Sequence, residues 1–334
     1  MNVFTTSTQK PSAHDQVLAD VEMPYHATYY PLGFPVDMIS NSQRVLDAAA
    51  ESWGQFRQRF TVPPLTVRLG VTQNPDDLYS LPQAPICRLD HHLVSHIADS
   101  YNFATCDLNE GSAFGWVTER TVEAPLYLRY HFLEASALCM IAASRASPLH
   151  AACVSMDGFG LLLCGDSGAG KSSLAFAAGR SGFTYTCDDA SYLLLNRKPP
   201  TVVGNCHQFR LRESGTILFP ELQGRTVTPR AAGKPSLEIP TSEFGDILTC
   251  ELTSISAIVF LNRQNVTQEN ILPFSKSEAA RWFRQTQVFK TTSLPLQLSA
   301  IERLTNLPIF EMRYTNLDWA VECLRQLATG GSAG

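Results

Sequence analysis

The sequence predicts an α/β protein: an α+β module over residues 1–145 is followed by an α/β sheet domain over residues 146–328 and a disordered tail at 329–334. Three observations predict this. Up to residue 145, short stretches of alternating apolar and polar residues stand beside two helical patterns. After residue 150, short apolar runs alternate with helix-length segments, which is typical of α/β sheets. A chain of 334 residues with 44% hydrophobic residues can also bury a core of this size.

Residues 1–30 resemble a frayed lead-in, and the proline and glycine of residues 29–40 favour an irregular or edge strand. Residues 41–56 predict a helix, because apolar side chains recur at helical spacing after Asn41 or Ser42, either of which can cap it. The remaining elements are strands over 64–71, 91–98, 102–108 and 113–119, a turn over 109–112, and a long buried helix over 125–147.

The second part begins with a hairpin, because Asp157-Gly158 separates two apolar runs and this pair is a strong signal for a tight turn. A short alanine-rich helix over 171–182 ends at Gly182. The other predicted strands cover 152–156, 160–165, 183–189, 191–195, 201–205, 255–262 and 308–314, and the other helices cover 277–289 and 317–328.

Charge and composition exclude several classes of protein. A net charge of −5 and a pI near 5.9 argue against binding to nucleic acid or to an anionic membrane, because both repel an acidic protein. Residues 1–16 lack the apolar core of a signal peptide, and the apolar stretch 126–143 carries Arg129, His131 and Glu134. The cysteines form no CxxC pair, which favours reduced thiols. We therefore expect a cytoplasmic protein without nucleic-acid or membrane partners, and the sequence is compatible with a homo-oligomer.

A glycine-rich stretch over residues 165–172 fits the P-loop pattern G-x-x-x-x-G-K-[ST]. Glycines let successive N–H groups face one point, and the helix that follows adds its positive N-terminal dipole, so a polyphosphate can be held there. Lys171 would reach the β- and γ-phosphates, and the Ser172 hydroxyl would bind Mg²⁺. The predicted nucleotide-binding residues are Gly165, Asp166, Ser167, Gly168, Ala169, Gly170, Lys171, Ser172 and Ser173.

Two aspartates follow the next predicted strand. Asp188 and Asp189 would lie near the γ-phosphate, with one facing Mg²⁺ and the other an incoming hydroxyl, since successive strand residues point to opposite sides. A kinase needs a base that accepts the proton of a hydroxyl, and an aspartate serves in other kinases. The alternative is a solvated pair of acids at a turn.

His150 precedes the strand that runs beside the P-loop strand. Its ring could approach Asp188 and set the orientation or proton affinity of that carboxyl group. The alternative is a structural histidine at the start of a strand. A weaker pattern, Asp90, His91, His92 and His96, has residue types that also suit a metal site.

Taken together, His150, the P-loop and the Asp188-Asp189 pair resemble the HPr kinase/phosphorylase family, of which this chain looks like a divergent member. The resemblance is specific over about residues 148–190 and looser to about residue 325. It implies a P-loop kinase domain with a fold like that of phosphoenolpyruvate carboxykinase, the cofactors ATP and Mg²⁺, and a protein serine hydroxyl as the acceptor.

Carried over by position, the resemblance implies that Lys171 and Ser172 bind phosphate and metal. Asp188 looks like the base, His150 looks like its partner, and Asp189 looks like an acid on the metal side. Catalytic roles therefore fall on Asp188, His150 and Lys171, and metal binding on Ser172 and Asp189.

The chain also departs from that family, because it lacks the Glu-x-Arg-Gly and Pro-Gly-Arg-Asn signatures. The corresponding stretches are residues 206–214 and 229–240. Either Arg210 or Arg212, and either Arg230 or Lys234, could supply the positive charge that a transferring phosphoryl group needs; surface charges are the alternative.

The sequence thus predicts an ATP-dependent kinase that phosphorylates a hydroxyl on a protein, a peptide or a small molecule. A nucleotide-binding regulatory or adaptor protein without transfer is the first alternative, and a hydrolytic P-loop ATPase is the second. The Asp188 and His150 pair separates the first two, because a pure binding module needs neither residue.

Overall fold

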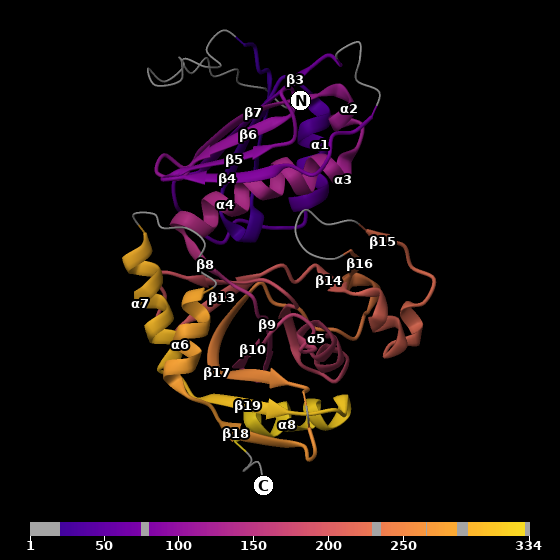
Figure 1. Cartoon of the computed structure of the whole chain (residues 1–334), viewed down its shortest axis with the longest axis vertical. Helices are drawn as coiled ribbons and strands as arrows, with labels where there is room; N and C mark the ends of the chain where they lie inside the picture. Colours follow the sequence, from indigo (N-terminus) through magenta and orange to yellow (C-terminus); the bar gives the residue numbers. More distant parts are fainter. Residues whose placement is uncertain (1–20, 75–79, 229–234, 265, 286–292, 331–334) are drawn as a thin grey trace, which may run out of the picture.

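The computed structural model describes residues 21–74, 80–228, 235–264, 266–285 and 293–330. Within these residues the strands form a seven-stranded sheet, a nine-stranded sheet and a small three-stranded sheet, which confirms the α/β class. The seven-stranded sheet uses residues 25–118 and the nine-stranded sheet uses residues 146–313. The two large sheets lie one above the other along the long axis of the molecule (Figure 1).

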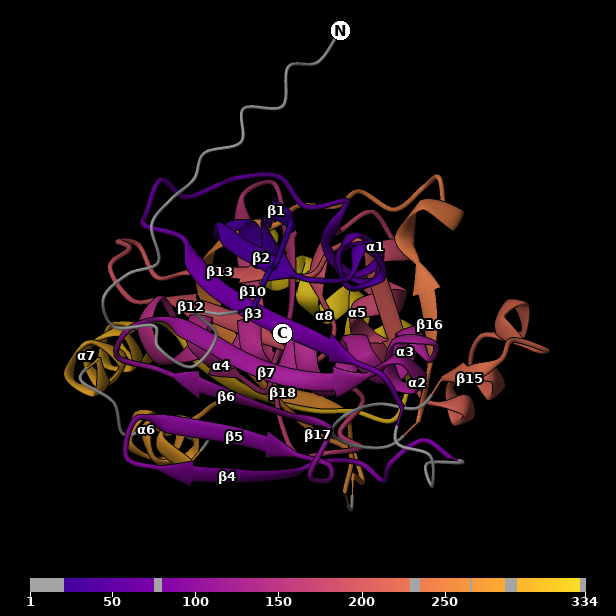
Figure 2. The same cartoon turned by 90° about the horizontal axis from the view of Figure 1, so that it is seen from above.

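The first sheet has a parallel centre and antiparallel edges. Strands β2, β3 and β7 are parallel neighbours, and the other pairs are antiparallel. Helices α1 (Gln43–Trp53) and α4 (Ala135–Ser144) pack on one face, between this sheet and the second part (Figures 1 and 2). The strand order is β1 (Tyr25–Tyr29), β2 (Val36–Ser40), β3 (Leu65–Thr72), β7 (Ser112–Thr118), β6 (Phe103–Asp107), β5 (Leu93–Ile97) and β4 (Ile86–Asp90).

Three sequence expectations for this part are corrected. The supposed lead-in contains strand β1, and β2 is an interior strand, because its alternate side chains are buried between β1 and β3. The long helix is interrupted: α2 (Glu119–Val122) and α3 (Pro125–Leu128) precede a π-helical turn over Arg129–Glu134, after which α4 ends at Ser144. The chain then becomes strand β8 (Ala146–Leu149), because Pro148 cannot continue a helix.

In the second sheet, three parallel strands end on the same side, so the residues that follow them lie close together. Strands β10 (Phe159–Cys164), β17 (Leu252–Asn262) and β19 (Ile309–Arg313) run parallel. Gly165, Arg263 and Tyr314, which follow them, therefore meet at their common carboxyl edge. The other strands are β8 (Ala146–Leu149), β9 (Ala152–Met156), β11 (Thr184–Cys187), β12 (Ser191–Leu194), β13 (Thr201–Gly204) and β18 (Asn270–Pro273).

Helices cover both faces of this sheet. Helices α5 (Lys171–Arg180) and α8 (Leu317–Thr329) share one apolar core with it, and α6 (Lys276–Gln285) and α7 (Leu294–Thr305) share another. The predicted hairpin is confirmed, since Asp157 and Gly158 adopt φ angles of 48° and 82°. Helix α8 reaches Thr329, and residues 331–334 of the predicted tail lie outside the described residues.

The sequence did not predict β4, β18, α7 or the strands of the small sheet. That sheet has the order β14 (Gln208–Leu211), β16 (Ser236–Pro240) and β15 (Val227–Thr228). Every residue of β4 is exposed, so it carries no alternating pattern.

Polar contacts join the two parts. Arg59 Nε donates to Glu251 Oε2 at 2.6 Å, and Tyr130 Oη donates to Glu238 Oε1 at 2.5 Å. On the opposite side, Gln297 of α7 donates to the Ala142 carbonyl of α4 at 3.1 Å. The helices of the first part therefore form a wall over the second sheet.

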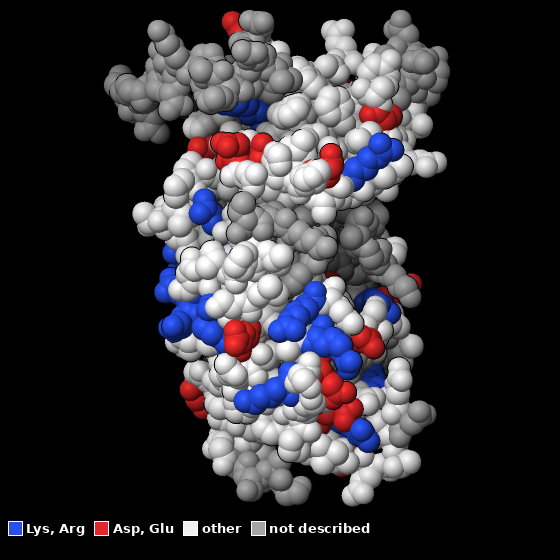
Figure 3. Space-filling model, turned by 60° about the vertical axis from the view of Figure 1, so that its left-hand side comes forward, with Lys and Arg blue, Asp and Glu red and all other residues white. Residues whose placement is uncertain are grey.

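None of the helices among the described residues has the length and apolarity needed to cross a membrane. The nine cysteines are free thiols, and Cys153, Cys164 and Cys187 are buried. On the face shown in Figure 3, basic and acidic side chains lie interspersed over the lower half.

Candidate active site

The loop after β10 is shaped by glycines. Gly165, Gly168 and Gly170 all have positive φ angles, of 142°, 96° and 97°. A Cβ atom on Gly170 would lie 2.5 Å from Tyr314 Oη, so a side chain is excluded there by space as well as by conformation. Helix α5 begins at Lys171, and its first turn leaves N–H groups without an intrahelical acceptor. A loop of this shape can hold an anion.

Lys171 is buried beneath the loop, with 5% of its surface exposed. Its Nζ donates to the carbonyl oxygens of Gly165 at 2.7 Å and Asp166 at 3.2 Å, and it lies 3.0 Å from His150 Nε2. Burial lowers the pKa of Lys171, and the nearby carboxylate of Asp189 opposes this shift. The ammonium group is thus held by carbonyl oxygens of the loop, within reach of a phosphate group that would bind there.

His150 contacts Asp189: its Nδ1 lies 3.3 Å from Asp189 Oδ1. His150 Nε2 faces the ammonium group of Lys171, and the tautomer with its proton on Nδ1 lets Nε2 accept from that group. The imidazole therefore connects Lys171 with Asp189. The Asp188 carboxyl group turns toward strand β14, and its expected partnership with His150 stays a prediction.

Asp188 lies inside the protein, with 5% of its surface exposed. Its Oδ2 accepts from the backbone N–H of Arg210 at 2.8 Å, and its Oδ1 accepts from Tyr185 Oη at 3.2 Å. Burial and then the charge of Asp189 raise its pKa to about 6, although both hydrogen bonds oppose the shift. The alternative of a solvated acid pair is therefore wrong for Asp188. A carboxyl group with this pKa is suited to proton transfer near neutral pH.

Asp189 and Ser172 lie next to the glycine-rich loop and line the same pocket. The Asp189 side chain is 29% exposed, and Ser172 Oγ donates to the Asp188 carbonyl at 3.2 Å. A carboxylate and a hydroxyl oxygen suit Mg²⁺, which in nucleotide sites takes few protein ligands and completes its shell with phosphates and water. Within the described residues, no three His, Cys, Asp or Glu side chains gather as metal ligands, and this includes residues 90–96.

Two of the predicted cations are now placed. Arg210 is an ion-pair residue, 3.1 Å from Glu238 on the neighbouring strand, and only 18% of its side chain is exposed. Arg212, just past the end of β14, donates from Nη2 to Ser167 Oγ at 2.5 Å and so lies over the loop. Arg230 and Lys234 lie outside the described residues.

Arg263 was missed by the sequence analysis. Its guanidinium lies 5.5 Å from the ring centre of Tyr314, next to Gly170. The signal was present, because Arg263 directly follows a predicted strand, and the carboxyl ends of parallel strands gather ligand-binding residues.

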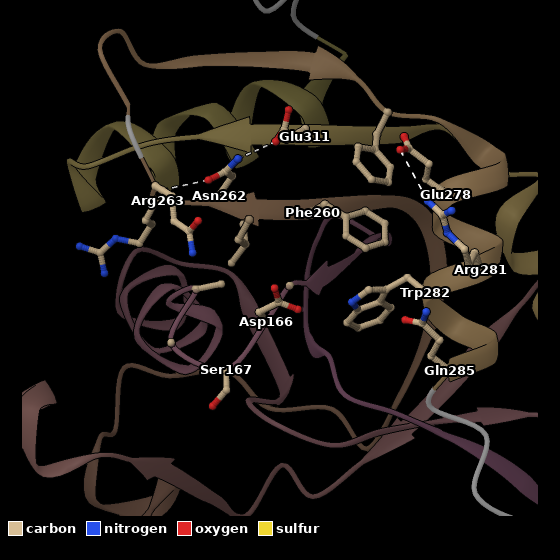
Figure 4. Close-up of a pocket in the computed structure, with 16 residues that line it drawn as sticks. Asp166, Ser167, Phe260, Asn262, Arg263, Glu278, Arg281, Trp282, Gln285 and Glu311 are labelled. Carbon is tan, nitrogen blue, oxygen red and sulfur yellow. Dashed lines mark hydrogen bonds and ion pairs between the residues drawn. The ribbon is translucent and has the colours of Figure 1, made fainter.

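Two hollows adjoin the loop. One, which we call the loop pocket, has a volume of about 840 Å³ and is lined by the first turn of α5, His150, Asp189, Arg212 and Arg263. The other, the aromatic pocket of about 670 Å³, lies on the side of residues 165–169. In Figure 4, Phe260 and Trp282 stand side by side in the aromatic pocket, with Asp166 of the loop facing them. Asn262 donates to Glu311 at 2.7 Å on its far wall.

The fold and the site define an α/β protein with a glycine-rich loop at the carboxyl edge of parallel strands. No model of a known protein family matches the chain, and no curated protein matches it. Among solved structures, the HPr(Ser) kinase/phosphatase from Coxiella burnetii matches with 11% sequence identity and a TM-score of 0.33, and the match covers 55% of this chain and 92% of that chain. The functional interpretation therefore depends on the residues of this chain.

The raised pKa of Asp188 predicts a pH-dependent stability. Below about pH 4 the group is protonated in both the folded and the unfolded state; above about pH 6 the folded state must hold a buried carboxylate. Its contribution to stability is thus present at low pH and lost as the pH rises through about 6. A shift from 3.8 to about 6 corresponds to about 3 kcal/mol.

Asp188→Asn cannot ionise, so its free energy of unfolding should rise relative to the native protein between pH 4 and pH 8. Urea unfolding in EDTA, without nucleotide, measures this difference. A difference that stays constant with pH would contradict the buried, pKa-shifted carboxyl group.

Proposed function

We propose that the protein is an ATP-dependent kinase that transfers the γ-phosphoryl group to a hydroxyl, similar to HPr kinase. The observation that carries this proposal is the place of Asp188: its backbone carbonyl accepts from Ser172 in the first turn after the glycine-rich loop, and its buried carboxyl group has a raised pKa. A loop that only binds nucleotide needs its backbone and its lysine, and gains nothing from an acid whose pKa is raised toward neutrality.

ATP would lie across the loop. The first turn of α5, with Ser172 and Ser173, and the cations Lys171, Arg212 and Arg263 face the loop pocket, where they suit the phosphates. The aromatic pocket, which Phe260, Phe274 and Trp282 line, suits the nucleoside end, since aromatic rings stack on bases.

Each residue of the site has its own role in phosphoryl transfer. On binding, Lys171 exchanges the carbonyls of Gly165 and Asp166 for phosphate oxygens, so the cation needs little movement. Asp188 accepts the proton of the attacking hydroxyl, and His150 positions Lys171 and Asp189 relative to one another. Ser172 and Asp189 would hold Mg²⁺, which neutralises charge on the phosphates.

A regulatory nucleotide-binding protein is the second candidate. It is favoured by the ion pair between Arg210 and Glu238. This pair holds Arg210 within the fold, so that this predicted cation does not serve the transferring phosphoryl group. A hydrolytic ATPase would use the same pocket and pass the phosphoryl group to water. Incubation with [γ-³²P]ATP and fractions of a cell extract separates the three: a labelled compound supports a kinase, free phosphate alone an ATPase, and binding without turnover a regulator.

Phosphoryl transfer is expected to require Mg²⁺ or Mn²⁺. Without a divalent ion, Asp189 faces the triphosphate as an uncompensated negative charge, so excess EDTA should lower transfer by about a hundredfold or more. Asp189→Asn should raise the Mg²⁺ concentration needed for half-maximal transfer, whereas the exposed Glu119→Gln should not. Full transfer in EDTA would remove the metal from the proposal.

A further inference from the structure

A third hollow lies on the opposite side of the acid pair. It is formed where α1 and the π-helical turn of the first part face residues 187–192 and 205–210 of the second. Asp188 lines this junction pocket, and Asp189 and Arg210 line both it and the loop pocket. The aspartates therefore stand between a space suited to phosphates and a second space whose far wall belongs to the first part.

The junction pocket is small. Its volume is about 180 Å³, well below the usual range of about 300 to 1,000 Å³ for drug-sized ligands. It therefore has room for a compound of roughly the size of a free amino acid.

The far wall is polar and fixed. Arg129 Nε donates to Ser52 Oγ at 2.7 Å, and Ser52 Oγ donates to Glu134 Oε1 at 2.8 Å. Arg129 also lies 3.4 Å from Glu51 and 3.7 Å from Glu134, so two carboxylates share this one cation and leave a net negative charge.

The charge of the lining is negative. Among the described residues, the carboxylates of Glu51, Glu134, Asp188 and Asp189 line the pocket against the guanidinium groups of Arg129 and Arg210. Arg210 is further neutralised by Glu238. A neutral or cationic compound is thus favoured over a carboxylate or a phosphate.

We propose that the junction pocket binds the phosphoryl acceptor, and that the acceptor is a small amino alcohol. Its hydroxyl faces Asp188 and its ammonium group faces Glu51 and Glu134. This inference rests on the proposed kinase activity. In the reaction, the acceptor oxygen forms a bond to the γ-phosphorus, the bond from that phosphorus to the β,γ-bridging oxygen breaks to leave ADP, and the hydroxyl proton passes to Asp188.

The first experiment compares acceptors with [γ-³²P]ATP. The probes are ethanolamine and L-serine as amino alcohols, glycerol as a neutral alcohol and D-glycerate as an anionic one, together with the small-molecule and protein fractions of an extract of the source cells. We expect label in the small-molecule fraction, most on ethanolamine, less on L-serine because of its carboxylate, and least on glycerate. Label confined to proteins, to glycerol or to an anionic compound overturns the inference and leaves the kinase intact, whereas no transfer in any sample refutes the kinase itself.

The second experiment changes the far wall. Glu134→Gln keeps the size and the hydrogen bond from Ser52 but removes the charge, and Gln55→Trp fills the pocket from an exposed position after α1. Each should raise the acceptor KM about tenfold or more, the cost of about one charge-assisted hydrogen bond, while ATP affinity stays unchanged. Glu110→Gln, in an exposed turn of the same part, is the matched control. An unchanged acceptor KM in both variants overturns the inference.

Discussion

Replacing Asp188 by asparagine is expected to lower phosphoryl transfer by about 10²- to 10⁴-fold, the usual contribution of a general base, or about 3 to 5 kcal/mol. ATP binding should persist, because Asp188 takes its hydrogen bonds from the Arg210 backbone and Tyr185, away from the loop. Asparagine fits this environment: its oxygen can accept from the Arg210 N–H, and its amide can donate to Tyr185 Oη. The variant therefore removes the base with little change in packing.

Titrating ATP calorimetrically and measuring transfer on the same preparation tests this expectation. Asp189→Asn is the matched control, since the same change one residue away should alter the Mg²⁺ requirement instead. If Asp188→Asn lost ATP binding, the residue would belong to the metal site. If transfer were unaltered, its assignment as the base would be wrong.

The structure also changes which residues should act together. Since His150 contacts Lys171 and Asp189, His150→Ala and Asp189→Asn should have non-additive effects on transfer. His150→Ala and Asp188→Asn should be closer to additive. The opposite pattern would support the pairing that the sequence predicted.

Local features of the fold could be predicted from the sequence, because their causes are local. The turn at Asp157-Gly158 needs two residues that tolerate positive φ, and the loop before α5 needs glycines at fixed spacing. Both therefore carry a signature within a few residues. The fully exposed β4 carries no comparable pattern. Helix α7 does carry one, since Ala300, Ile301 and Leu304 recur at helical spacing and are buried, but it was not recognised.

The partners of the site residues could not be predicted, because they depend on strand pairing between distant segments. Arg210 and Arg212 are equivalent in the sequence. Pairing of β14 with β16 places Arg210 directly opposite Glu238, which binds it, whereas Arg212 lies beyond the strand and reaches Ser167. The backbone N–H of Arg210 in β14 donates to Asp188, while the neighbouring Asp189 contacts His150. The junction pocket was equally hidden, since its walls come from both parts of the chain.

Replacing Lys171 should lower phosphoryl transfer about as much as replacing Asp188 does. Unlike that change, it should also weaken ATP binding directly. Lys171→Ala removes the buried cation of the loop, and losing one group that stabilises charge in a transition state costs about 10²- to 10³-fold in rate. ATP affinity should fall as well, by about tenfold or more, because charge-assisted hydrogen bonds to phosphate are lost. The side chain already contacts Gly165 and Asp166, so its removal also takes a donor from two loop carbonyls.

Lys171→Met separates these two causes. Methionine fills the space of the lysine stem but supplies neither charge nor donor, so a purely structural role of Lys171 would be largely restored, and its role toward phosphate would not. We therefore expect Lys171→Met to keep the thermal unfolding temperature closer to the native value than Lys171→Ala does, and to be equally deficient in ATP binding and transfer. Lys276→Ala, an exposed lysine at the start of α6, is the matched control and should change neither quantity. If Lys171→Met bound ATP and transferred phosphate like the native protein, the loop would not be a phosphate site, and the kinase proposal would fall with it.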